Sequence, residues 1–469
     1  MKSKVRLSLL LLISSTITVV LLLPFHILMR LCGTFPIQDF AKDSFGLVPF
    51  LCVIVCLAII QIHLSSFFRI RNASVPILCY FMKEGVHFRF FKAIAVCFLT
   101  CLCSFLMGLA LGGEAPSVFM GAIVFAFVFS FEDESQERLL RAIRVGAAVG
   151  FSLAFMNPIA GVLFSFAPEK WGKHYLKTNY KLFLEGIFCS FFAYALYGTV
   201  KGLIYFQDYQ NAFYQAFLFV DFQTDLFNAG IASLTHYWIY LLMIPFALGF
   251  GYLYVHGLKG LRELLWRDKP ITYAISFFGA LILLPLCNYL NPLSLGTGAK
   301  LIEENFLLLE KGWLIFMELF LLRLVLTGFS LTSHFQGGNI IPSLGIGMLL
   351  GVMFAGALKA TGLPLNEETM RLISFSFMLA FFGAMSHKQT ATFALVLSFG
   401  PAPALLLAIA PALIVSYFLS NKIKSDVSLS EAFAESDIKN CAYAKALWSH
   451  YPYCSPMFED IWDHRFTQR

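Results

Sequence analysis

The sequence predicts an all-α integral membrane protein built from two inverted-topology repeats of tilted and broken helices. Of its 469 residues, 58% are hydrophobic and only 13% are charged, whereas soluble domains carry about 25% charged residues. Apolar runs long enough to cross a bilayer recur along the whole chain. Glycine- and proline-containing breaks interrupt these runs at matching places in two halves, which is typical of transporters built from inverted repeats.

The apolar runs define the expected helices in order. Several contain Gly or Pro, which predicts more helices than membrane spans, some of them short. The charged segment 131–144 is predicted to be a water-facing helix start. The opening MKSKVR, followed by an apolar run without a cleavage site, predicts a cytoplasmic N-terminus in a multi-pass protein of a cell inner (plasma) membrane. The runs are 7–24, 46–62, 93–111, 117–131, 142–166, 182–205, 231–255, 272–290, 313–331, 343–361, 372–399 and 401–419.

The predicted organisation has two membrane repeats, a connector and a tail. The connector is more polar and rich in aromatic residues (YFQDYQNAFYQAF), and the tail is short and mixed in charge. We expect the tail to be a small cytoplasmic appendage. The boundaries are 1–205 for the first membrane repeat, 206–230 for the connector, 231–421 for the second membrane repeat and 422–469 for the tail.

One break carries an ionisable residue. Glu114 lies in the segment 112–116 (GGEAP), between two apolar helical runs. A carboxylate at membrane depth is costly and indicates a pathway or relay, and irregular backbone at that depth has to line a cavity or pack inside protein. Pro116 suits the first turn of the next helix. The amides of that helix start form an anion site, for which the Glu114 carboxylate competes.

Three further breaks have the same character. They occur at 72–76 in the first half and at 296–298 and 337–342 in the second half. Each places Gly or Pro where a helix starts. Interrupted segments at corresponding places in two halves indicate a binding site near the middle of the membrane.

Together these motifs resemble the CLC family of chloride channels and chloride/proton antiporters, over about residues 70 to 420. GLALGGEAPSVFMGAIV resembles the family's G-x-E-G-P element, with Ala115 replacing the second glycine. The stretch 138–164 is similar to the family segment that follows it. LSLGTGAKLIEENFL is similar to the family's L-G-x-G element. The segment 323–351 resembles its G-G-x-F-x-P element, with Ile340 in place of Phe.

The resemblance implies a homodimer embedded in membrane lipid, in which each subunit has its own anion pathway. Helix N-termini near 73–76, 113–117 and 338–342 would converge on dehydrated chloride or a similar small anion. Glu114 would be the gate: deprotonated, it occupies an anion site, and protonated, it swings out and lets chloride pass. The anion-binding positions carried over are Ala73, Ser74, Val75, Gly113, Ala115, Asn339, Ile340 and Ile341.

Two departures from the family pattern leave chloride affinity and selectivity open. Family members often have Ser in the first motif, whereas alignment on Pro76 puts Ala73 there, with Ser74 one position later. The family's second hydroxyl comes from a Tyr after the last span. Here that region (NKIKSDVSLSEAF) has no Tyr, and Ser425 or Ser428 is the nearest substitute.

A third departure concerns protons. Antiporters of the family resemble one another in a Glu at the inner end of the span that here ends in LFSFAPEK. That position aligns with Pro168, which cannot carry a proton and is preceded by Ala167. Two alternatives remain: channel-like or weakly coupled anion conduction, and chloride/proton antiport in which Glu169 is the inner proton acceptor.

A third class of function is an intramembrane hydrolase. The chain contains no H-E-x-x-H, G-x-S-x-G or P-loop motif, so we expect no enzyme activity and no catalytic residues. We also expect no cofactor and no metal site. With a formal net charge of +6 and no dense basic patch, nucleic acid is not an expected partner.

Four other polar residues lie in or beside apolar runs. Arg323 is expected to pair internally or to face water, and His334 and His387 are interpreted as polar residues near helix ends. Lys388 is interpreted as an anchor at the membrane interface.

Overall fold

The computed structural model describes most of the predicted membrane part. The predicted connector, all of the tail beyond Lys422, and the predicted site residues Ala73, Ser74 and Glu169 lie outside the described residues. So do Pro168 and the two tail serines of the sequence analysis. The described residues are 2–34, 44–68, 75, 78–79, 90–131, 136–166, 173–205, 237–265, 270–303, 313–398 and 403–422.

Over these residues the protein is helical, as predicted. The first half contains α1 (Lys2–Thr34), α3 (Ser44–Phe68), α5 (Phe90–Met107), α6 (Glu114–Ser130), α7 (Gln136–Ala154), α8 (Pro158–Phe166) and α9 (Lys173–Tyr205). The second half contains α11 (Tyr237–Leu265), α12 (Pro270–Leu290), η3 (Pro292–Ser294), α13 (Ala299–Glu303), α14 (Trp313–Thr332), α15 (Ile340–Ala360), α16 (Glu367–Ser386), α17 (Gln389–Leu395), η5 (Val396–Ser398) and α18 (Pro403–Lys422).

The helices have the dimensions of membrane spans. Within the described ranges, eight helices are long and apolar enough to cross a bilayer, and three shorter apolar helices accompany them. One of the short ones is α6, which begins at Glu114. Long and short apolar helices together indicate a multi-pass membrane protein in which some helices are broken.

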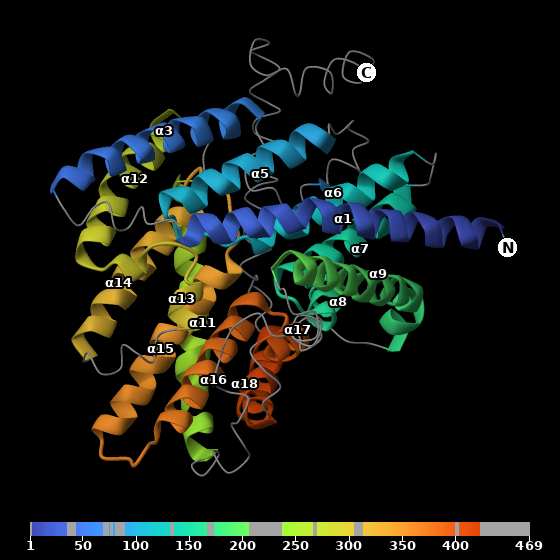
Figure 1. The fold of residues 1–469 in the computed structure, drawn as a ribbon. Helices are drawn as coiled ribbons and strands as arrows, with labels where there is room; N and C mark the ends of the chain where they lie inside the picture. The colour runs from blue at the N-terminus through green and yellow to red at the C-terminus, as the bar shows by residue number, and fades with distance from the viewer. Residues whose placement is uncertain are drawn as a thin grey trace.

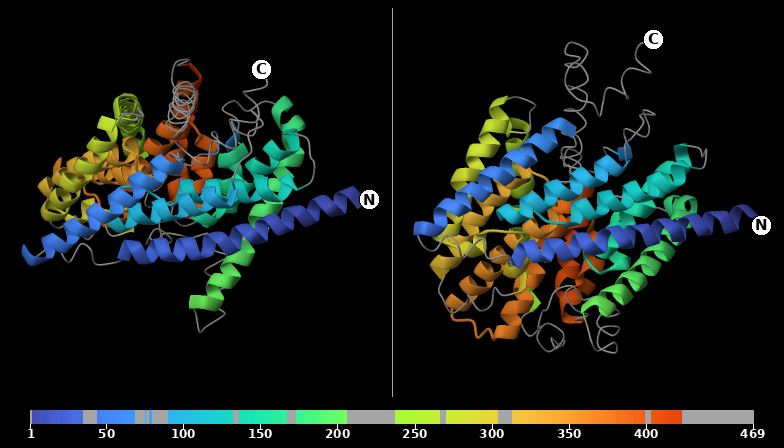
Figure 2. Two further views of the ribbon diagram at one scale, coloured as in Figure 1. Left: turned by 90° about the horizontal axis from the view of Figure 1, so that it is seen from above. Right: turned by 45° about the horizontal axis from the view of Figure 1, so that its top comes forward.

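The helices of the two halves form two groups that contact each other. In Figure 1 the first half, blue to green, lies beside the second half, yellow-green to red, and Figure 2 shows the same grouping from two other directions. Packing within the groups follows one scheme: α6 packs on α7 and α7 on α8, as α15 packs on α16 and α16 on α17. Contacts between the groups include α8 against α17 and α3 against α12.

Two long apolar runs split into two helices at equivalent places. The run 142–166 divides between α7 and α8, where Met156 has φ +49°, and the run 372–399 divides between α16 and α17, where His387 has φ +53°. A left-handed residue stops a helix, because it turns the next peptide away from the helix axis. The Asn157 side chain then starts α8 by accepting from the Ala160 amide, and its Nδ2 donates to the Ala394 carbonyl of α17 at 2.9 Å.

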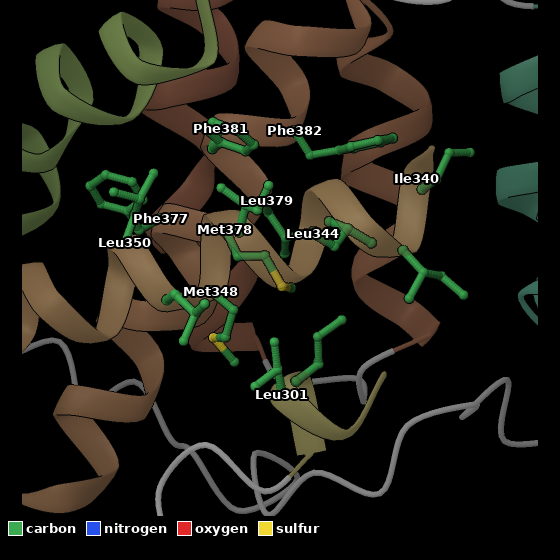
Figure 3. Close-up of a cluster of buried hydrophobic side chains, with 14 of the residues drawn as sticks. Leu301, Ile340, Leu344, Met348, Leu350, Phe377, Met378, Leu379, Phe381 and Phe382 are labelled. Carbon is green, nitrogen blue, oxygen red and sulfur yellow. The ribbon is translucent and has the colours of Figure 1, made fainter. Parts of the chain in front are cut away.

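Large apolar side chains fill the space between α15 and α16. Figure 3 shows Leu344 and Met348 of α15 close to Met378 and Phe381 of α16, with Leu301 of α13 below them. All five side chains are buried. Their burial makes the first turns of α15 part of a packed core, and this packing fixes the position of the helix start.

The charged start of α7 is exposed, as predicted for 131–144. Glu137 and Arg141, four residues apart, form an ion pair of 2.6 Å with 75% and 52% exposed side chains. Such a pair adds only a few tenths of a kcal/mol to a helix, about 0.3–0.5 kcal/mol. It therefore marks a water-facing surface and contributes little to stability.

The crossing of α6 and α7 gives a stability prediction. A Cβ at Gly146 would lie 2.4 Å from the Gly121 carbonyl oxygen, so Gly146→Ala forces the two helix backbones apart. We expect it to lower the free energy of unfolding by about 1–3 kcal/mol, measured as a lower melting temperature in detergent. Gly257→Ala on α11 is the matched control, because a Cβ there meets nothing within 4 Å. Equal melting temperatures for the two variants would contradict this account of the crossing.

Candidate functional site

Two helices from different halves begin at the same place. Helix α6 has Gly113 as its N-cap and α15 has Asn339, and each has a proline, Pro116 or Pro342, as its third helical residue. The first amides of a helix have no partner within the helix, and the helix dipole makes this end positive. The structure thus brings two positive helix ends together inside the protein.

A two-residue antiparallel bridge joins the two helix starts. The Gly112 amide donates to the Gly338 carbonyl at 2.8 Å, and the Gly338 amide donates to the Gly112 carbonyl at 2.5 Å. Each glycine directly precedes the N-cap of its helix, so the bridge pairs equivalent residues of the two halves. This is the geometry expected where a twofold axis passes between inverted repeats.

The Glu114 carboxylate crosses from the first half to the second. Its Oε1 accepts hydrogen bonds from the Ile340 amide at 2.5 Å and the Ile341 amide at 2.9 Å. The side chain is 1% exposed, and its Oε2 has no hydrogen-bond partner among the described residues. Hydrogen bonds to a carboxylate are stronger than neutral ones. The carboxylate therefore lies where a free anion would bind at the start of a helix.

Two glycines make room for this carboxylate. A Cβ at Gly112 would lie 1.9 Å from the Glu114 Oε2, and a Cβ at Gly338 would lie 2.4 Å from its Cδ. Both distances are far below van der Waals contact. The bridge residues therefore have to be glycine as long as the carboxylate stays on the α15 amides.

Hydrogen bonds from α1 and α9 hold the α6 side of the site. The Ser117 hydroxyl donates to the Gly113 carbonyl at 2.7 Å, and His26 Nε2 lies 2.8 Å from the Ser117 Oγ. His26 Nδ1 lies 3.0 Å from the Tyr197 hydroxyl. The α1 helix thus reaches the first turn of α6 through a polar side chain.

On the α15 side of the site, hydrogen bonds from α3 and α5 hold the loop. The Thr100 hydroxyl donates to the Gln336 Oε1 at 2.6 Å, and the Ser104 hydroxyl donates to the Gln336 carbonyl at 2.8 Å. Gln61 Nε2 in turn donates to the Ser104 Oγ at 2.7 Å. Because Gln336 is two residues from Gly338, side chains of the first half fix the loop of the second.

A buried arginine holds the neighbouring loop. Arg323 is fully buried, and its Nη1 donates to the Ser294 carbonyl at 2.9 Å and to the Gly296 carbonyl at 2.6 Å. The Gly296 amide donates to the Gly108 carbonyl at 2.8 Å, close to the end of α5. The predicted internal pairing of Arg323 is confirmed, and its partners are backbone carbonyls.

The predictions for the other polar residues have mixed outcomes. His387 caps the end of α16, and His334 follows α14 by two residues, so both lie near helix ends as predicted. The interpretation of Lys388 as an interface anchor stays a prediction, and the structure adds a packing role. Its Nζ donates to the Phe164 carbonyl at 2.6 Å and lies 5.2 Å from the centre of the Phe164 ring, so it holds α8 against α17.

The predicted site residues fall into three groups. Helices α6 and α15 begin where the sequence predicts, and the structure brings together Gly113, Glu114, Ala115, Asn339, Ile340 and Ile341. Val75 is partly buried against the apolar cluster of the first half. Ala73, Ser74 and Glu169 are not described.

Sequence reasoning missed the residues that position the site. His26, Ser117, Thr100 and Gln336 are polar residues within or beside apolar runs, and that placement is the only sequence signal they carry. In the part of the chain that the structure describes, no group of three His, Cys, Asp or Glu side chains is arranged to hold a metal ion.

Comparison with known families shows to which family this sequence is related. The model of the voltage gated chloride channel family matches residues 9–421. The chain belongs to the CLC family. Among solved structures, it is similar to a slow cyanobacterial Cl⁻/H⁺ antiporter at 15% identity, with a TM-score of 0.72, covering 91% of this chain and 96% of that one.

Two more solved CLC structures have the same fold. A eukaryotic CLC transporter has 15% identity and a TM-score of 0.66, covering 92% of this chain and 74% of its own. A CLC-type fluoride/proton antiporter has 21% identity and a TM-score of 0.64, covering 91% and 97%. At such identities the likeness shows the shared fold, and the chemistry of this chain has to be argued from its own residues.

The glycine bridge gives a second prediction. Gly112→Ala places a Cβ against the Glu114 carboxylate, so we expect it to lower the free energy of unfolding by about 1–3 kcal/mol. In a Glu114→Ala background the space is empty, and the same substitution should cost less. Melting temperatures of the two single variants and the double variant in detergent measure this coupling. Additive effects would contradict the close approach.

Proposed function

We propose that this CLC protein moves chloride or a similar small anion across a membrane through a pathway gated by Glu114, in a channel-like or weakly coupled manner. The observation that carries the proposal is the hydrogen bonding of the Glu114 carboxylate to the Ile340 and Ile341 amides. A side-chain oxygen that accepts hydrogen bonds from these amides occupies the place that a permeating anion would take. When the carboxylate leaves, the amides become available to chloride.

The chemistry of this site suits a passing anion. Backbone amides and helix dipoles attract an anion without a full countercharge, so binding stays weak enough for release, as conduction requires. The proposed anion-binding set keeps the predicted membership: Ala73, Ser74, Val75, Gly113, Ala115, Asn339, Ile340 and Ile341. Protonation makes the Glu114 carboxyl a weaker acceptor for amides, and this is how the gate opens.

The alternative is chloride/proton antiport through the same gate. Two of the solved structures with this fold are named as antiporters, one for Cl⁻/H⁺ and one for fluoride/proton. Antiport needs an inner proton acceptor, for which Glu169 is the candidate, one residue after Pro168. Ala167 and Pro168 at the expected position favour the channel-like mode.

The proposal also covers the oligomeric state, the location and the organisation of the protein. It is a homodimer in membrane lipid, placed in a cell inner or plasma membrane with its N-terminus in the cytoplasm. Residues 1–205 and 231–421 are its two membrane repeats, 206–230 the connector and 422–469 a cytoplasmic tail. Its activity is transport, and an intramembrane hydrolase is the less favoured alternative.

A flux assay tests the gate. In liposomes under a chloride gradient, we expect Glu114→Ala to keep chloride flux intact or faster and to abolish any proton movement, because the competing carboxylate is gone. Chloride and proton fluxes are recorded together. Glu137→Ala, which removes an exposed carboxylate of α7, is the matched control and should behave as the wild type. Full proton coupling in Glu114→Ala, or loss of its anion flux, would contradict the gate.

The affinity for chloride gives another test. Ala73→Ser supplies the hydroxyl that family members often have in the first motif, so we expect it to raise chloride affinity by about tenfold, the effect of one hydrogen bond to a charged group. Calorimetric titration with chloride measures it. An unchanged affinity would instead point to Ser74 or to a site made of backbone amides alone.

A further inference from the structure

A chain of hydrogen bonds leads from α9 to the residue before Glu114. The Tyr197 hydroxyl lies 3.0 Å from His26 Nδ1, His26 Nε2 lies 2.8 Å from the Ser117 Oγ, and the Ser117 hydroxyl donates to the Gly113 carbonyl at 2.7 Å. Every link lies within ordinary hydrogen-bond distance. This series of hydrogen bonds ends at Gly113, the N-cap of α6, directly beside Glu114.

The direction of each bond follows from the Ser117 hydroxyl. It has one hydrogen, which it gives to the Gly113 carbonyl, so towards His26 it can only accept. His26 therefore carries its hydrogen on Nε2, and its Nδ1 accepts from the Tyr197 hydroxyl. A neutral imidazole satisfies both contacts at once.

The second half contains an equivalent contact. Ser343 is the fourth residue of α15 as Ser117 is the fourth of α6. The Tyr254 hydroxyl of α11 lies 3.1 Å from the Ser343 Oγ. In each half, then, a side chain of the first described helix holds the serine in the first turn of the broken helix. Because a serine at the same helix position is held in both halves, we interpret these contacts as fixing the two helix starts.

Packing of α1 reinforces the contact in the first half. A Cβ at Gly113 would lie 2.0 Å from the Met29 sulfur, so α1 also touches the N-cap of α6 one turn beyond His26. The first turn of α6 is thus held by a polar and an apolar side chain of α1. Any change in that turn moves the point from which the Glu114 side chain starts.

We propose that His26 is a positioning residue for Glu114: through Ser117 it fixes the first turn of α6 and so keeps the carboxylate on the α15 amides. The proposal rests on the gating role of Glu114 argued above. It predicts that a change on α1 alters the protection of two amides in the other half of the molecule.

Hydrogen–deuterium exchange of the full-length protein tests this without a transport assay. The readout is the peptide that contains Ile340 and Ile341, whose amides Glu114 protects. We expect His26→Leu to speed its exchange about fivefold, the factor that corresponds to one hydrogen bond of about 1 kcal/mol. His26→Gln should stay near the wild-type rate, because its terminal amide nitrogen replaces Nε2 as the donor to Ser117.

Three further variants make the test specific. His256→Leu on α11 is the control, since His256 is exposed and its ring contacts the carbonyl and the ring of Tyr252, one turn away on the same helix. Glu114→Ala alone should speed the exchange, and adding His26→Leu should change nothing more. Ser117→Ala should reproduce His26→Leu and replaces it if that variant does not fold.

Two results would overturn the proposal. One is an unchanged exchange rate in both His26→Leu and Ser117→Ala. The other is an equal acceleration by His26→Leu with and without Glu114. The flux assay separates this outcome from failure of the proposed function: if Glu114→Ala keeps full proton coupling or loses its anion flux while the exchange responds as expected, the gate is wrong and the positioning role stands.

Discussion

The structure depends on one constraint: two helix N-termini from different halves meet inside the protein and need negative charge. The Glu114 carboxylate meets this need by accepting from the Ile340 and Ile341 amides. Without an acceptor, those buried amides would cost about 1–3 kcal/mol each. In the proposed function, movement of this side chain off the amides leaves an anion site that is already formed.

The surrounding parts of the fold serve this meeting point. The bridge between Gly112 and Gly338 fixes the two loops against each other and leaves space for the carboxylate. Polar side chains then hold each loop: His26 acts through Ser117, and Thr100 and Ser104 of α5 act on Gln336. The large apolar interface between α15 and α16 supplies the rigid support behind one of the helix starts. Irregular backbone in the membrane part is thus packed inside protein and held by hydrogen bonds from protein groups.

Much of this was predictable from the sequence, because membrane helices and their breaks are local features. Composition and Gly/Pro patterns predicted the helices, the break at Glu114 and the starts of α6 and α15. The splits at Met156 and His387 were not predicted, because a left-handed residue leaves no apolar signature. The bridge and the contacts of His26 and Lys388 were also missed, since they join residues far apart in the chain and depend on tertiary packing. The inner proton acceptor stays a prediction.

The most direct measurement of the central claim is anomalous diffraction from crystals of the Glu114→Ala variant grown in bromide. If the carboxylate substitutes for an anion, its removal opens the α15 amides to a halide. We expect a bromide peak at hydrogen-bonding distance from the Ile340 and Ile341 nitrogens, and none there in the wild-type protein with Glu114 in place. A variant whose helix starts are unchanged but which binds no bromide at these amides would contradict the account.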